Sequence, residues 1–157
     1  MDKPLFYINK PVNELPLGLA GETFASSDPL IYHTSIKNYK PTPLVTMPGL
    51  AKKYGAKNIY IKDESFRFGL NAFKALGASY AIHKLLERDP SIETFCSATD
   101  GNHGRAVAWA DKQHGKESRI FVQRGTTEAR IDAIQGEGAV VEVIDRNYEA
   151  TCEHAQI

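Results

Sequence analysis

Short apolar runs alternate with helical patterns in the second half of the chain. The runs Thr94–Ala98, Arg119–Gln123 and Ala139–Ile144 are strand-like, and the last of them is rich in β-branched residues, which favour strands. Between them lie helical patterns at Arg105–His114 and in a segment that ends near Ile134. Strands and helices that alternate through short connections predict an α/β fold, a parallel sheet with flanking helices.

The first half is less regular. Met1–Lys40 shows no sustained periodicity and is rich in proline and glycine, so we expect an extended arm with room for one short helix. Leu50–Tyr54 has a helical pattern, and Asn58–Lys62 alternates like a strand. Asparagine favours the position before a helix, so Asn71 is a predicted cap for a helix that runs to about Arg88. Another asparagine, at position 147, is a predicted cap for one more helix.

Lys74 is the first candidate chemical group. It lies in the first turn of the predicted helix, and Gly77, Ala78, Ala81 and Leu85 share its face. Small apolar neighbours disfavour a charged amine, and a neutral lysine amine attacks carbonyl groups. Spacing alone leaves two interpretations open. Lys74 is either a Schiff-base lysine or a lysine whose stem lies on a core helix while its amine reaches water.

Composition narrows the function classes. The chain has 157 residues, of which 42% are hydrophobic and 24% charged, which is enough for one domain with a hydrophobic core. The formal net charge is zero, so nothing favours nucleic acid or an anionic membrane as a partner. The two cysteines, Cys96 and Cys152, form neither a metal-binding spacing nor a disulfide framework. We therefore expect a cytoplasmic protein without a metal site.

The turn Thr99–Gly104 reads T-D-G-N-H-G and follows the first predicted strand of the regular half. Parallel sheets bind ligands at the carboxyl ends of their strands, beside helix N-termini. The glycines permit tight backbone geometry, and Asn102 can donate or accept a hydrogen bond. Alone, this motif is weak. Asp100 or Asn102 can simply cap the next helix, and a lone His103 is more often a capping or packing residue than a catalyst.

The two motifs together are specific. K-D-E-S-F-R-F-G-L-N-A-F-K-A-L-G-A, followed by S-A-T-D-G-N-H-G-R-A-V-A, resembles the fold-type II pyridoxal-phosphate enzymes, which include the serine and threonine dehydratases and the cysteine synthases. The resemblance covers roughly Pro41 to Ile144. It implies that Lys74 forms a Schiff base with pyridoxal 5′-phosphate and that Asn102 contacts the 3′-oxygen of this cofactor.

Asp100 stands where the dehydratases of this family usually have a serine. The stretches around it resemble the family's ammonia-lyases, which act on 2,3-diaminopropionate. That substrate has an amine where serine and threonine have a hydroxyl, and a carboxylate can hold the ammonium and exchange a proton with the substrate. However, a helix N-terminus and a cationic Schiff base both favour the ionised carboxylate, which is a weaker base. The acid–base role of Asp100 is therefore implied by the resemblance alone.

The resemblance also implies a reaction. The substrate's α-amine displaces Lys74, and the cofactor is the electron sink for loss of the α proton. Lys74 or Asp100 accepts that proton from opposite faces, so both enantiomers are expected substrates. The β-amine leaves as ammonia, and the remainder becomes pyruvate and a second ammonia.

Members of this family are more than twice as long as this chain. We therefore expect a fragment: residues 1–80 as an N-terminal arm and part of the larger cofactor domain, and residues 81–157 as a truncated smaller α/β domain. The phosphate-binding glycine loop and a second acid are expected outside the sequence, and the complete enzyme is expected to be a homodimer. Two alternatives remain: a serine or threonine dehydratase-like lyase, and an inactive remnant that serves as a protein-binding module.

Overall fold

The structure is a computed structural model that describes residues 26–99 and 101–155. Predictions that concern residues 1–25 or Asp100 lie outside the described residues. The described elements are, in chain order, α2 (Asp28–Ser35), β1 (Leu44–Thr46), α3 (Pro48–Tyr54), β2 (Tyr60–Lys62), the short 3₁₀ helix η1 (Glu64–Phe66), α4 (Lys74–Arg88), β3 (Thr94–Ala98), α5 (Asn102–Gln113), β4 (Glu117–Gln123), α6 (Glu128–Gln135), β5 (Val140–Ile144) and α7 (Tyr148–His154).

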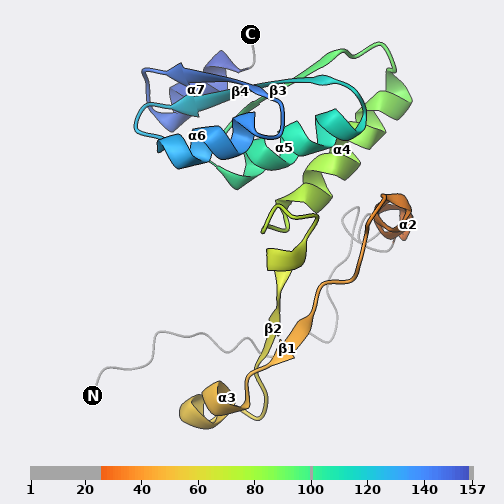
Figure 1. Cartoon of the computed structure of the whole chain (residues 1–157), viewed down its shortest axis with the longest axis vertical. Coiled ribbons are helices and arrows are strands. Elements are labelled where there is room, and N and C mark those ends of the chain that lie inside the picture. Colours follow the sequence, from red (N-terminus) through yellow and green to blue (C-terminus); the bar gives the residue numbers. More distant parts are fainter. Residues whose placement is uncertain (1–25, 100, 156–157) are drawn as a thin grey trace, which may run out of the picture.

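The second half of the chain forms the predicted parallel sheet. Its strand order is β3–β4–β5, with Thr94 aligned to Glu117 and Arg119 aligned to Val140. Helices α5 and α6 lie on one face and α7 on the other, as Figure 1 shows. The prediction of an α/β fold with a parallel sheet and flanking helices is confirmed.

The core lies between the central strand and the two helices on the same face. Ile120 and Val122 of β4 and Ile134 of α6 are fully buried. Helix α5 approaches the sheet closely at Gly104, where an added Cβ would overlap the Thr99 side chain and lie 2.8 Å from Cγ2 of Ile120. Glycine at this position therefore lets the N-terminus of α5 lie directly against Thr99 at the end of β3 and Ile120 in the middle of β4.

Helix α4 packs against α5 rather than against the sheet. The predicted start of this helix was wrong, because Asn71 has a left-handed backbone (φ 57°) and the helix begins at Lys74. The buried stripe of the helix consists of Ala75, Ala78, Ser79 and Ile82.

In the part of the chain that the structure describes, Lys74 does not lie on a buried apolar helix face as predicted. Of the four residues predicted to share its buried face, Ala78 is buried, whereas Gly77, Ala81 and Leu85 are exposed, as is Lys74 itself. The helix is rotated relative to the prediction, so Lys74 lies at the margin of the buried stripe.

The remaining segments lie apart from this sheet. Strands β1 and β2 form an antiparallel pair that projects away from the packed body together with α3 (Figure 1), and Leu44 aligns with Lys62. Helix α2 is the short helix expected in the N-terminal arm, and Nε2 of His33 lies 2.8 Å from the carbonyl oxygen of Leu76 in α4. Among the described residues, no helix has the length and apolar character needed to cross a membrane.

Candidate active site

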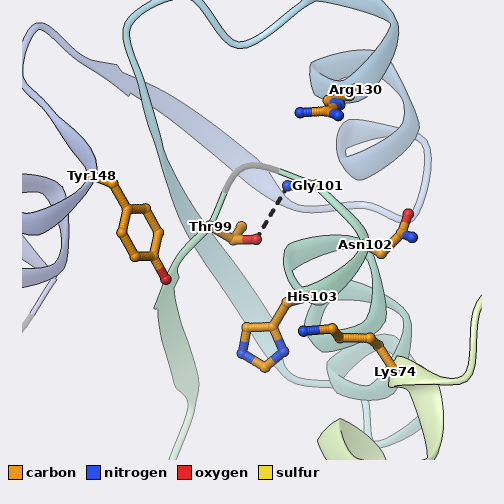
Figure 2. A pocket seen from close by; sticks show the side chains of 7 residues that line it. All are labelled: Lys74, Thr99, Gly101, Asn102, His103, Arg130 and Tyr148. Carbon is orange, nitrogen blue, oxygen red and sulfur yellow. Dashed lines mark hydrogen bonds between the residues drawn. The ribbon is translucent and has the colours of Figure 1, made fainter. Parts of the chain in front are cut away.

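A cavity of about 360 Å³ lies where the N-terminal turns of the helices meet, beside the carboxyl end of β3. Lys74 is the first residue of α4, and Asn102 is the first residue of α5. Arg130 comes from the first turn of α6, and Tyr148 is the first residue of α7. The structure thus brings Lys74 and Asn102 to one cavity (Figure 2), whose full lining is Lys74, Thr99, Gly101, Asn102, His103, Arg130 and Tyr148.

Thr99 holds the loop on which the cavity depends. Its buried hydroxyl oxygen accepts hydrogen bonds from the backbone N–H groups of Gly101 (3.2 Å) and Gly104 (3.3 Å). Its own backbone N–H donates to the carbonyl oxygen of Phe121 in β4 at 2.9 Å. Sequence reasoning missed this residue. A hydroxyl side chain at a strand end before a glycine-bearing turn was the available signal, because such side chains accept bonds from the following backbone.

His103 lies beside Lys74. Figure 2 shows the Lys74 amine extended toward the imidazole ring of His103. Partial burial lowers the pKa of His103, and the positive charge of Lys74 lowers it further. Both causes disfavour the imidazolium. His103 is therefore neutral near pH 7 and can exchange a proton with a neighbouring group.

Tyr148 enters the cavity from the other face of the sheet. Its helix is fixed by the predicted cap, because Oδ1 of Asn147 accepts a hydrogen bond from the backbone N–H of Ala150 at 3.0 Å. Thr151, which is fully buried, donates its hydroxyl to the carbonyl oxygen of Asn147 at 2.9 Å. Figure 2 shows the Tyr148 hydroxyl turned toward the cavity. Neither Tyr148 nor Arg130 was predicted, although Tyr148 is the first residue of α7, which follows β5, and Arg130 lies in the first turn of α6, which follows β4.

The chemistry of the lining fits a carbonyl-bearing anionic cofactor. Lys74 offers a primary amine, which is the group that forms imines with aldehydes. The first turn of α5 offers backbone N–H groups to anions and oxygen acceptors, and Arg130 adds a positive charge. Asn102 adds an amide that both donates and accepts.

Comparison with known proteins decides the family. Residues 36–156 match the family described as pyridoxal-phosphate dependent enzyme. The chain belongs to this family. The resemblance inferred from the two sequence motifs is therefore confirmed, and pyridoxal phosphate is the cofactor that the family name specifies.

The chain is similar to proteins named diaminopropionate ammonia-lyase and to a threonine dehydratase. The chain is 42% identical over 146 residues to the diaminopropionate ammonia-lyase of Escherichia coli (strain K12). This match covers 80% of this chain and 37% of the relative. It is 37% identical over 94 residues to the biosynthetic L-threonine dehydratase of Lactococcus lactis, with 60% and 22% covered. The chain thus spans little more than a third of the length of the curated ammonia-lyases it matches.

Solved structures agree on the fold. The Escherichia coli diaminopropionate ammonia-lyase, crystallised with an aminoacrylate-PLP azomethine reaction intermediate, matches with a TM-score of 0.77 and 44% identity, over 80% of this chain and 35% of that one. A threonine deaminase from Solanum lycopersicum matches with a TM-score of 0.68 and 25% identity, over 88% and 37%. The described sheet and helices are therefore part of the fold-type II architecture.

Proposed function

We propose that this chain serves the pyridoxal-phosphate-dependent elimination of ammonia from 2,3-diaminopropionate, which gives pyruvate and ammonia. The observation that carries the proposal is the convergence of Lys74 and Asn102 in one cavity at the helix N-termini. The choice of substrate is supported by sequence identity, which is higher and extends over more residues with a diaminopropionate ammonia-lyase than with a threonine dehydratase.

Two residues are assigned to the cofactor. Lys74 would hold the cofactor through Nζ, and the amide of Asn102 would form a hydrogen bond with the cofactor's 3′-oxygen. Pyridoxal phosphate supplies an electron sink for carbanion chemistry at the substrate's α carbon when it is bound. Lys74 opens α4 and Asn102 opens α5, so the packing of these two helices sets the distance between the groups.

The substrate's charges have partners in the same loop. The first turn of α5 offers N–H donors that suit a carboxylate. We assign to Asp100, which lies outside the described residues, the binding of the β-ammonium and a proton exchange with the substrate. Its neighbours Thr99 and Gly101 both line the cavity, which is the support for this assignment. With substrate bound, Lys74 would hold or accept a proton at Nζ.

The experiment is reductive trapping. The chain is incubated with pyridoxal phosphate, reduced with borohydride, digested and examined by mass spectrometry. We expect one dominant adduct on Lys74, because the other described lysines lie outside this cavity. Lys74→Met should abolish it. Lys84→Met, at the far end of the same helix, should leave it intact. Labelling scattered over many lysines would contradict the proposal and favour a binding remnant.

The threonine dehydratase-like alternative is tested at Asp100. Asp100→Ser introduces the residue that dehydratases of this family usually have at this position. If Asp100 selects the diamine, this variant loses ammonia release from diaminopropionate and gains elimination from serine. Unchanged activity on the diamine would contradict the assigned role. The substrates are compared in the same assay, with pyruvate as the common product.

Larger-scale features complete the proposal. We propose that the chain consists of two parts. Residues 1–80 are an arm with part of a larger cofactor domain, and residues 81–157 are a smaller α/β domain. Residue 80 lies within α4, so this helix would join the two parts. We also propose a homodimer in the cytoplasm. Cys96 and Cys152 are unpaired, which suits a reducing compartment.

A further inference from the structure

We propose that the imidazole of His103 is the proton-exchange partner of Lys74, accepting a proton from Nζ as this atom bonds to a carbonyl carbon. The inference deepens the proposed function, on which it rests for the identity of the carbonyl compound. It assigns a role to a residue whose own motif position gave no reason to choose catalysis over packing.

The placement of the two side chains is built into the fold. Lys74 and His103 both lie in the first turns of their helices, α4 and α5. These helices pack on each other and both contribute small residues, among them Ala75 and Ala106, to one buried cluster, which holds the two turns side by side. Figure 2 shows the lysine amine directed at the ring, and both residues line the same cavity. His103 is exposed as a residue, although neighbouring atoms partly desolvate its imidazole, so a proton that the ring accepts from Nζ has a path to water.

The charges around the ring favour this use. The titratable or charged groups that line the cavity with His103 are Lys74 from α4, Arg130 from α6 and Tyr148 from α7. Partial burial lowers the pKa of His103 most, and the positive charge of Lys74 lowers it further. The resting imidazole is thus neutral and has a nitrogen lone pair for a proton. Asp100, which is close to His103 in sequence, lies outside the described residues, so Asp100→Asn serves as a control.

The step balances without any oxidant or reductant. Lys74 reacts as the neutral amine, after its ammonium form has released one proton to water. The lone pair of Nζ forms the bond to the carbonyl carbon, and the π pair moves to the oxygen. The protons left on Nζ then become more acidic, so an N–H bond breaks, its electron pair stays on Nζ and the proton binds the free nitrogen of His103. The C–O bond then breaks and its electron pair leaves with the oxygen, while the electron pair on Nζ forms the second C–N bond. Both protons that the neutral amine loses end on this oxygen, which departs as water. His103 carries one of them.

The first test needs no cofactor. The five histidine rings of the chain are titrated by NMR, and the signal that disappears in His103→Gln is assigned to His103. Lys74→Met removes the neighbouring positive charge and keeps the length of the side chain. We expect the pKa of His103 to rise in this variant, since that charge lowers it. Lys112→Met, which removes a charge at the other end of α5, is the matched control and should leave His103 unchanged.

The second test measures a rate. Adduct formation between Lys74 and pyridoxal phosphate is followed by absorbance across a range of pH. General acid–base assistance contributes about 10²–10⁴-fold, so His103→Gln should slow the reaction at least tenfold near pH 7 without changing the final extent of labelling. Added imidazole should restore part of the rate in proportion to its concentration. A structural role for His103 would not give this rescue. Asp100→Asn, measured alongside, shows whether the neighbouring carboxylate accounts for any of the effect.

The outcomes separate this inference from the proposed function. If the wild-type chain forms no adduct at Lys74, the proposed function fails, and the NMR titration alone decides whether Lys74 and His103 interact. If the adduct forms but His103→Gln reacts at the wild-type rate, the inference is overturned and the proposed function stands. An unchanged His103 titration in Lys74→Met also overturns it.

Discussion

The packed body from α4 to α7 and the projecting arm of β1, α3 and β2 differ in how deeply their strands are buried. In the body, Ile120 and Val122 are fully buried in the middle strand. In the arm, every residue of both strands is exposed, including Leu44 and Tyr60 at 63% and 56%. All described residues that line the candidate active site belong to the body. The difference teaches that the site depends on the packing of four helices around one sheet, and not on the arm.

The largest effect we predict compares one substitution in the two regions. Ile120→Ala removes a side chain that is 1% exposed, whereas Ile61→Ala removes one that is 45% exposed. Burial sets the cost, so Ile120→Ala should lower the free energy of unfolding by about 4 kcal/mol and Ile61→Ala by less than about 1 kcal/mol. Urea denaturation measures both. Equal losses would show that the arm is buried under the conditions of the measurement, and would break the comparison.

A second prediction concerns Asp111, which is fully buried in α5. Its Oδ2 accepts a hydrogen bond from the Ser118 hydroxyl, whereas Oδ1 is the one buried side-chain polar atom without a partner among the described residues. Burial raises the pKa of Asp111 to about 6, and the bond from Ser118 opposes this. Burial in the body therefore favours the neutral form of this carboxyl group more than water does.

The sign of the pH effect follows. The folded-state pKa is raised above the ordinary value of 3.8, so the contribution of Asp111 to stability is fully present below about pH 4 and is lost as pH rises through about 6. A difference of about two pKa units corresponds to about 3 kcal/mol. Asp111→Asn cannot ionise and should remove this dependence. Urea midpoints from pH 4 to 7 measure it, and parallel curves for the two proteins would contradict the prediction.

Local signals predicted the body well. β3 was predicted with the observed bounds, and β4 and β5 within two residues, because these runs stand between clear turns. The Asn147 cap was also predicted, since capping depends only on neighbouring residues. The start of α4 was not, because packing against α5 set its first residue and left Asn71 in a turn with positive φ. The same packing decided that Lys74 lies at the margin of the buried stripe.

The site was predicted only where a motif named it. Lys74 and Asn102 meet in the cavity as expected, while their roles and that of Asp100 stay predictions. Arg130 and Tyr148 were missed because the topology of the sheet, rather than a local motif, brings the first turns of α6 and α7 to the cavity. A rule that examines the first residue of every helix after a parallel strand would have included Tyr148.

The smallest effect we predict concerns the edge of the body, where α7 presents Tyr148 to the cavity. Asn147→Ala removes the side-chain oxygen that accepts from the backbone N–H of Ala150, and loss of such a cap costs about 1 kcal/mol. Asn147→Asp keeps an acceptor in the same position and should retain most of the stability. Because Tyr148 is the first residue of this helix, Asn147→Ala should also shift the NMR signals of His103 across the cavity. A loss of about 1 kcal/mol with unchanged His103 signals would mean that α7 stabilises the sheet without positioning the cavity wall.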